Sequence, residues 1–254
     1  MVNLPADELL SSYRLADLNR AVDEIFDKTT VGKITSHDPH AYLLGGQPGA
    51  GKTTLHRIIR AFDPNAVIVN GDNHREHHPN FERIQALFGK DSVVYTQGFA
   101  NAVTQALIGK LCEGRYNFIV EGTMRDPSVP LNTCKLLKAQ GYKVELAIIA
   151  VDRNVSWSST IDRYNEMKAK GFALRATSKV SHDEAADRIP ENLNIIYGEG
   201  VFDRITLYNR DSECLYDSNI TPHTNPHQLL HDIINSSYKR EAARGEFKCN
   251  REER

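Results

Sequence analysis

Residues 46–53 read Gly-Gln-Pro-Gly-Ala-Gly-Lys-Thr and match the pattern G-x-x-x-x-G-K-[ST] in full. The apolar run 41–44 precedes them, and an amphipathic segment at 52–62 follows them directly. This order of strand, glycine-rich loop and helix is the context that separates a phosphate-binding loop from a chance match in a turn. It also constrains the fold, because such a loop lies at the end of a buried strand in an α/β sheet.

The residue types of this loop suit the phosphates of a nucleotide. Glycines let backbone N–H groups turn inward, where side chains would collide, and the following helix directs its positive dipole end at the same anions. Lys52 adds a mobile cation for the β- and γ-phosphates, and the Thr53 hydroxyl can bind Mg²⁺. We therefore predict that ATP, with Mg²⁺, is bound by Gly46, Gln47, Pro48, Gly49, Ala50, Gly51, Lys52, Thr53 and Thr54.

The rest of the chain alternates between apolar runs and helical periodicity. Strands are predicted at 41–44, 66–69, 116–120, 144–151, 205–208 and 213–216, and helices at 4–27, 52–62, 93–111, 131–140, 156–170, 181–196 and from 225. The alternation predicts an α/β fold of the P-loop kinase type, with a mostly parallel central sheet and helices on both faces. Without a repeat or linker, residues 1–254 are predicted to form a single domain, with an N-terminal helical segment at 1–28 and a charged, frayed tail at about 239–254.

Composition argues against several classes of protein. The net charge of −2 gives no electrostatic reason to expect binding to nucleic acid or to an anionic membrane. The longest strongly apolar run, 146–151, is far shorter than the roughly 20 residues of a membrane span. Four cysteines without metal-like spacing are typical of reduced thiols. We therefore predict a cytoplasmic protein that binds neither membrane nor nucleic acid.

Acidic residues follow two of the predicted strands. Asp72 comes after the strand at 66–69, and Glu121 ends the strand at 116–120. Ligands of doubly wound sheets bind at the carboxyl ends of the strands. Asp72 can there orient an acceptor hydroxyl and take its proton during phosphoryl transfer, although a turn or helix-cap role is the alternative. Glu121 can hold substrate hydroxyls or a Mg²⁺-bound water.

Three arginines complete the pattern of a small-molecule kinase. Arg125 lies four residues after Glu121, and Arg163 and Arg175 flank a helix and a glycine-containing loop. Arginines so placed can offset charge on a transferring phosphoryl group. No N-K-x-D element of guanine-specific GTPases occurs. The alternatives are another P-loop kinase, such as an antibiotic phosphotransferase, and a nucleotide-binding switch that has no acceptor.

These motifs together resemble the zeta toxin family of bacterial toxin–antitoxin systems. The matching stretches are 43–54, 69–72, 78–81, 121–125, 160–164, 175–177 and 207–210, in the family's order. The resemblance implies a bacterial cytoplasmic kinase that uses ATP and Mg²⁺ to phosphorylate the 3′-hydroxyl of the amino sugar in UDP-N-acetylglucosamine, which would block peptidoglycan precursor synthesis. It also implies a small helical antitoxin that obstructs the nucleotide site, and the N-terminal helical segment is suited to pack against such a partner.

The resemblance also assigns roles by position. It makes Asp72 the base, Lys52 the cation of the phosphate loop, and Arg163 and Arg175 the arginines on the transferring phosphate. The sugar-nucleotide site that it implies comprises Asp72, Gln105, Glu121, Thr123, Arg125 and Thr133. The chain departs from the family at Asn70, where several members carry Asp, and at Gln105, where the streptococcal form has Glu. We expect these departures to loosen selectivity among UDP-sugars.

Overall fold

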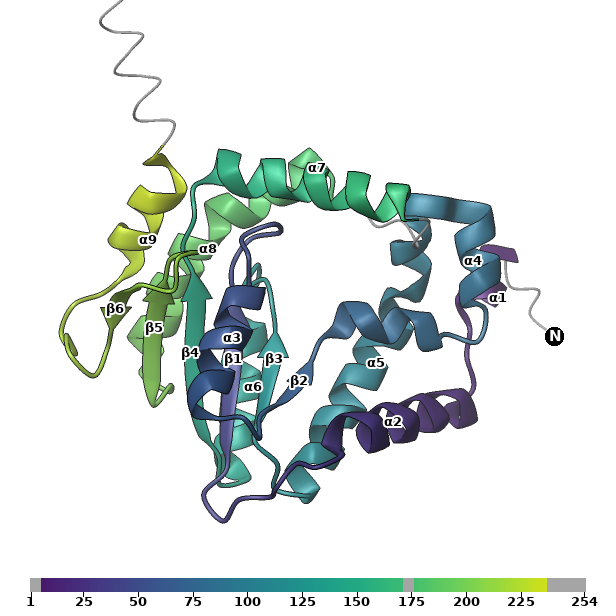
Figure 1. The fold of residues 1–254 in the computed structure, drawn as a ribbon, viewed down its shortest axis with the longest axis horizontal. Helices are drawn as coiled ribbons and strands as arrows, with labels where there is room; N and C mark the ends of the chain where they lie inside the picture. The colour runs from purple at the N-terminus through teal and green to yellow at the C-terminus, as the bar shows by residue number, and fades with distance from the viewer. Residues whose placement is uncertain (1–5, 171–175, 237–254) are drawn as a thin grey trace, which may run out of the picture.

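A six-stranded sheet forms the centre of the molecule (Figure 1). The computed structural model describes residues 6–170 and 176–236. The strands are β1 (His40–Gly45), β2 (Val67–Val69), β3 (Phe118–Glu121), β4 (Lys143–Ile149), β5 (Arg204–Tyr208) and β6 (Cys214–Asp217), in the order β2-β3-β1-β4-β5-β6. Neighbouring strands pair in parallel except β5 and β6, which are antiparallel. The predicted mostly parallel sheet is therefore confirmed.

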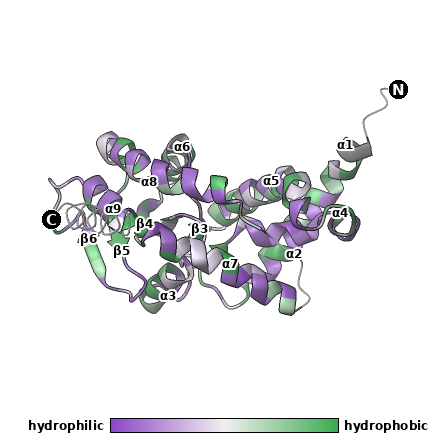
Figure 2. Cartoon of the chain, turned by 90° about the horizontal axis from the view of Figure 1, so that it is seen from above, coloured by the Kyte–Doolittle hydropathy of each residue, from purple (hydrophilic) through white to green (hydrophobic). Residues whose placement is uncertain are grey.

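Helices connect the strands. They are α1 (Ala6–Ser11), α2 (Leu15–Thr30), α3 (Thr53–Phe62), α4 (Phe81–Phe88), α5 (Ser92–Glu113), α6 (Ser128–Ala139), α7 (Arg153–Ala169), α8 (Lys179–Glu199) and α9 (His227–Ile234), with the 3₁₀ segments η1 (Gly71–His77) and η2 (Gly89–Asp91). Figure 2 shows α6 and α8 on one side of the sheet and α3 on the other. In Figure 1, α7 lies across the carboxyl ends of the central strands.

Alternate side chains of β1 enter two different cores, which is why the whole strand is apolar. Leu43 points into the larger core, which α2, α5, α6, α8 and α9 cover. Leu44 points into the smaller core, where Leu55 and Ile59 of α3 pack. A strand buried on both faces carries no polar alternation, and this matches the continuous apolar run in the sequence. The predicted helices on both faces of the sheet are confirmed.

The predicted single helix over 4–27 is wrong in one respect, because the chain leaves helical geometry between α1 and α2. Arg14 has extended backbone, with φ −95° and ψ 157°. Its backbone N–H and its Nε both lie 3.1 Å from Oδ2 of Asp17. A carboxylate in the first turn that binds back to the preceding residue starts a helix, so α2 begins anew at Leu15.

A second difference lies between β2 and α5, where the apolar spacing predicted no helix. This stretch contains η1, α4 and η2. Within α4 only Ile84 is buried, so the helix has no apolar stripe long enough to be recognised. The helix packs against α5, and this tertiary contact stabilises it in place of an apolar stripe.

Some predictions fall outside the described ranges. They concern residues 1–5 of the N-terminal helical segment, the tail at 239–254, and Arg175. Within residues 6–170 and 176–236, no helix combines the length and apolarity needed to cross a membrane.

Candidate active site

The predicted site residues gather where β1, β2 and β3 end. Leu44 of β1 lies opposite Glu121 of β3. Val69 of β2 lies opposite Val120, which puts Asn70 level with Glu121. Because β1 continues directly into residues 46–53, the phosphate loop and the acids of the two neighbouring strand ends lie side by side.

The loop after β1 has a backbone that only glycine adopts without strain. Gly46, Gly49 and Gly51 have φ values of +141°, +75° and +94°. A Cβ atom at Gly46 would lie 2.6 Å from Cγ2 of Ile149, and one at Gly49 would lie 2.1 Å from the carbonyl oxygen of Ser156. Both backbone conformation and space therefore require glycine, and the loop is packed closely against β4 and α7.

Gln47 anchors the loop from within. Its side chain is 0% exposed, and its Nε2 donates to the carbonyl oxygen of Val151 at 2.9 Å and to Oγ of Ser156 at 3.2 Å. Both N–H groups of the amide are thus used inside the protein. The resulting contacts tie the loop to the end of β4 and to the first turn of α7.

Arg210, in the turn between β5 and β6, braces the loop from outside, and residue-by-residue reasoning did not assign it a role. Its guanidinium donates to the carbonyl oxygens of Gly49 and Ala50, the latter at 3.0 Å from Nε, and to the Ser159 hydroxyl at 3.0 Å. Burial lowers the pKa of this guanidinium. Arg210 thus holds these two carbonyl oxygens on the outer side of the loop, and the N–H groups of the glycines can face a ligand on the inner side. In the sequence, only the family resemblance at 207–210 indicates that Arg210 matters, because an arginine in a turn is otherwise expected to lie in solvent.

Lys52 is the centre of a cluster of charged side chains. Burial lowers its pKa; Glu121 and Asp72 act to raise it, while Arg163 and Arg125 act to lower it. The effects of the four charged side chains are Coulombic and therefore require proximity. The structure thus brings together five of the residues that the sequence singled out, from the phosphate loop, two strand ends and α7.

Asp72 lies in the first turn of η1 and is held by two neighbours. Its backbone N–H donates to Oδ1 of Asn70 at 3.0 Å, and Nε of Arg75 lies 3.1 Å from its Oδ1. Arg75 is itself buried and donates to the carbonyl oxygen of Val93 at 2.8 Å and to Oγ1 of Thr96 at 3.2 Å. The carboxylate is 56% exposed, so one face remains open. The spacing Asp-x-x-Arg is the sequence signal that identifies Arg75 as its support.

Asn70 joins the two acids. While its Oδ1 accepts from Asp72, its Nδ2 donates to Oε1 of Glu121 at 2.8 Å. Nε2 of His56 lies 3.1 Å from the same Glu121 oxygen. An aspartate at position 70 has no N–H to give and would add a third carboxylate. This gives a physical reason for the asparagine at position 70, where the chain departs from the family that it resembles.

Four other residues predicted for the acceptor site come from three parts of the chain. Thr123 is half-buried and Arg125 is exposed, both in the segment after β3. Gln105 is exposed on α5. Thr133 of α6 donates its hydroxyl to the carbonyl oxygen of Val129 at 2.8 Å, so that group is engaged within its own helix. Among the described residues, no hydrogen bond joins Gln105 or Thr133 to the cluster around Lys52, and their predicted roles stay predictions.

The two predicted arginines of the α7–α8 region have different outcomes. Arg163 is exposed on α7, the helix that lies across the strand ends (Figure 1). Arg175 lies outside the described residues, so its predicted role is not tested. Of the two, the structure therefore brings Arg163 to the phosphate loop.

Known proteins resemble this chain over most of its length. The family model described as Zeta toxin matches residues 22–221. Toxin PezT of Streptococcus pneumoniae is 41% identical over 211 residues, which cover 82% of this chain and 83% of that protein. Toxin zeta of Enterococcus hirae is 37% identical over 219 residues, which cover 85% and 76%. A solved structure from the PezAT chromosomal toxin–antitoxin system of S. pneumoniae superposes with a TM-score of 0.81 at 37% identity, covering 89% of each chain.

Proposed function

Because this chain belongs to the zeta toxin family, we propose that it is the toxin of a toxin–antitoxin pair and acts as an ATP-dependent kinase of UDP-N-acetylglucosamine. The fold is kinase-like and shared with a relative from a toxin–antitoxin system. The acceptor we propose is the 3′-hydroxyl of the amino sugar. Its phosphorylation would withdraw this precursor from peptidoglycan synthesis.

One observation carries the proposal. Lys52 on the phosphate loop shares its electrostatic surroundings with Asp72 and Glu121 from two neighbouring strand ends, and with Arg125 and Arg163. A protein that only binds a nucleotide has no need of an open carboxylate beside its phosphate site. A kinase needs one, because the acceptor hydroxyl must lose a proton as the phosphoryl group arrives.

The residues present fit the phosphates of ATP. The three glycines of the loop leave a cradle that Cβ atoms would fill, and the carbonyls of Gly49 and Ala50 are turned outward to Arg210. Lys52 donates to the carbonyl oxygen of Gly46 at 3.1 Å. Phosphate oxygens are stronger acceptors than this carbonyl, so we expect Nζ to turn to them and its pKa to rise.

Magnesium fits the same site through a hydroxyl and the nucleotide. No group of three or more His, Cys, Asp or Glu side chains that could hold a metal occurs in the described ranges. Mg²⁺ commonly keeps few protein ligands and binds through substrate phosphates. Thr53 is exposed at the first residue of α3 and would supply one oxygen. The ion would offset negative charge on the phosphates.

Different residues of the protein have different roles in the transfer. Asp72 accepts the proton of the acceptor hydroxyl, and Arg75 keeps the carboxylate oriented toward the site. Lys52 and Arg163 offset the charge on the transferred group. Glu121, fixed by Asn70, accepts hydrogen bonds from sugar hydroxyls. Because Asn70 is neutral, we propose that other UDP-sugars are accepted besides UDP-N-acetylglucosamine.

We also propose that a small helical antitoxin obstructs the nucleotide site. The support is the family membership and a relative that comes from the PezAT toxin–antitoxin system. The N-terminal helices offer apolar surface for such a partner, since Leu9 is 61% exposed and Leu15 is 71% exposed. Loss of ATP binding on co-purification with the antitoxin is the expected consequence.

The test is direct detection of the product. Purified protein is incubated with ATP, Mg²⁺ and a panel of UDP-sugars, and ³¹P NMR and mass spectrometry follow the phosphate. We expect a gain of one phosphate on UDP-N-acetylglucosamine. Asp72→Asn should lower the rate about 10²–10⁴-fold while ATP binding persists. Asp91→Asn, an exposed aspartate of η2, is the matched control and should leave the rate unchanged.

Three outcomes separate the alternatives. Phosphate on several UDP-sugars supports the looser selectivity assigned to Asn70. Transfer to other small alcohols but to no UDP-sugar indicates a kinase with a different acceptor. ATP bound or hydrolysed without transfer, unchanged in Asp72→Asn, would overturn the kinase assignment in favour of a nucleotide-binding switch.

A further inference from the structure

Helix α8 carries two polar side chains that are almost fully inside the protein. His182 is 0% exposed and Asn192 is 7% exposed. Burying a polar group costs free energy unless it is hydrogen-bonded, so the partners of such groups indicate what they hold in place. The partners of these two residues lie on opposite halves of the candidate active site.

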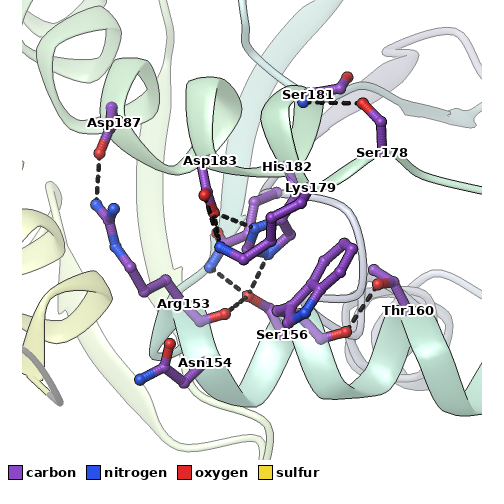
Figure 3. Close-up of polar contacts among 12 residues, drawn as sticks. Arg153, Asn154, Ser156, Thr160, Ser178, Lys179, Ser181, His182, Asp183 and Asp187 are labelled. Carbon is purple, nitrogen blue, oxygen red and sulfur yellow. Dashed lines mark hydrogen bonds and ion pairs between the residues drawn. The ribbon is translucent and has the colours of Figure 1, made fainter.

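The contacts of His182 form a chain across α7 and α8, which Figure 3 shows. Oγ of Ser156 lies 2.9 Å from Nε2 of His182, and Nδ1 lies 3.0 Å from Oδ1 of Asp183. Lys179 Nζ lies 2.6 Å from Oδ2 of Asp183. The Ser156 hydroxyl also donates to the carbonyl oxygen of Arg153 at 3.0 Å. The direction of its hydrogen bond with Nε2 follows the tautomer of His182, and the link between the two side chains holds in either case.

This chain ends on the phosphate loop. Oγ of Ser156 accepts from Nε2 of Gln47 at 3.2 Å. Gln47, Ser156 and His182 are all 0% exposed, so the hydroxyl cannot reach a substrate, although the order Ser, His, Asp resembles that of a hydrolytic triad. The function left for the chain is mechanical. It fixes the amide that anchors the phosphate loop.

Asn192 holds a strained residue in the segment after β3. Met124 has φ +55° although it is not a glycine, and it is 4% exposed. Its carbonyl oxygen accepts from Nδ2 of Asn192 at 2.7 Å, and its Sδ packs where a Cβ of Gly45 would be 2.1 Å away. Such a backbone is strained and persists only where its surroundings impose it. Thr123 and Arg125, both predicted for the sugar-nucleotide site, flank Met124 directly.

We propose that α8 is a positioning helix for both substrates: His182 sets the phosphate loop through Ser156 and Gln47, and Asn192 sets the acceptor loop, residues 122–125, through the Met124 carbonyl. The two residues are ten positions apart, which is about 15 Å along a helix. Neither touches a substrate. The inference rests on the proposed kinase function, since that function makes one loop the donor side and the other the acceptor side.

Steady-state kinetics of two single variants test this division, and each variant is the other's control. His182→Ala should raise the KM for ATP about tenfold, the effect of leaving buried hydrogen-bonding groups unpaired, and leave the KM for the UDP-sugar within about twofold. Asn192→Leu, close in volume but without a donor, should do the reverse. His182→Gln, whose amide can again meet the Ser156 hydroxyl, should recover most of the ATP affinity.

Measurements without turnover keep the positioning role separate from the proposed function. Equilibrium binding of a fluorescent ATP analogue, and hydrogen exchange of peptides covering 46–53 and 122–125, need no acceptor. We expect His182→Ala to weaken analogue binding and to speed exchange in 46–53. Asn192→Leu should speed exchange in 122–125 alone. Should the wild type phosphorylate no UDP-sugar while these differences remain, the proposed substrate fails and the positioning role stands.

The proposal is overturned if both variants perturb both loops equally, or if neither perturbs its own loop. If His182→Ala does not fold, Ser156→Ala breaks the same link by removing a single oxygen atom and must give the same selective loss of nucleotide affinity. Unchanged nucleotide affinity in Ser156→Ala would then refute the role of the chain.

Discussion

Replacing Gly49 with alanine should damage the protein far more than the same change at Gly141. Both glycines have nearly the same backbone conformation, with φ +75° at Gly49 and φ +79° at Gly141. They differ in space. A Cβ at Gly141 would meet no atom within 4 Å, whereas one at Gly49 would lie 2.1 Å from the carbonyl oxygen of Ser156 and 2.8 Å from Cγ2 of Thr160. The pair therefore separates backbone strain from packing against α7.

The magnitudes follow from these distances. A left-handed alanine costs about 1–2 kcal/mol, and both variants bear this term. Gly49→Ala must in addition open a contact that is about 1.3 Å short of the ordinary 3.4 Å, against the backbone of a helix. Overpacking of this kind costs about 1–3 kcal/mol more. At about 2–4 °C per kcal/mol, Tm should fall by about 2–8 °C in Gly141→Ala and by about 4–20 °C in Gly49→Ala.

The assay is thermal unfolding of both variants side by side, with and without ATP and Mg²⁺. Moving the Gly49 carbonyl also breaks its hydrogen bond from Arg210, so the loop loses its shape. We expect Gly49→Ala to lose the thermal stabilisation that ATP gives, and Gly141→Ala to keep it. Equal falls in Tm, with ATP stabilisation intact in both, would refute the packing of α7 against the phosphate loop.

Four further variants test the energetics. Lys52→Met should raise the Tm of the protein without ATP, because burial lowers the pKa of this amine and its charge destabilises the fold at neutral pH. This gain in Tm should shrink as pH rises through the lowered pKa of Lys52. ATP should no longer raise the Tm of the variant. A hydrogen bond from Arg204 lowers the pKa of Asp217, so the carboxylate stabilises the fold above its ordinary pKa of 3.8 and this stability is lost as pH falls. Asp217→Asn should therefore reduce the fall in Tm between about pH 5 and pH 3. In urea unfolding, Leu55→Ala, at a fully buried position, should cost about 2–5 kcal/mol. Ile220→Ala, at a position 77% exposed, should cost under about 0.5 kcal/mol, and equal losses would contradict the assigned core.

The phosphate loop and the order of strands and helices along the chain could be predicted from sequence, because both depend on residues that are close together in the sequence. The eight residues 46–53 form one turn between a strand and a helix, and their chemistry follows from their types and spacing. Asp72 and Glu121 were found because parallel strands present their carboxyl ends at one edge. The family could be predicted for the same reason, since its motifs are short and local.

Sequence periodicity failed where a segment has no apolar stripe of its own. The break between α1 and α2 depends on the hydrogen bonds of Arg14 to one carboxylate, and α4 buries a single apolar side chain. Neither leaves a signal over a window of eleven residues. Local polar contacts and packing against neighbouring elements decide such segments.

By itself, then, the sequence determined that a nucleotide-phosphate loop stands at the end of a buried strand in a mostly parallel α/β sheet with two acids close by, and it pointed to the family. Only the tertiary structure decided what holds these groups. Arg210 meets Ala50 across 160 positions, and Gln47 meets Ser156 across 109. Contacts between residues so far apart depend on strand register and helix packing, which no local pattern encodes. For that reason His182 and Asn192 acquire a role only in the folded chain.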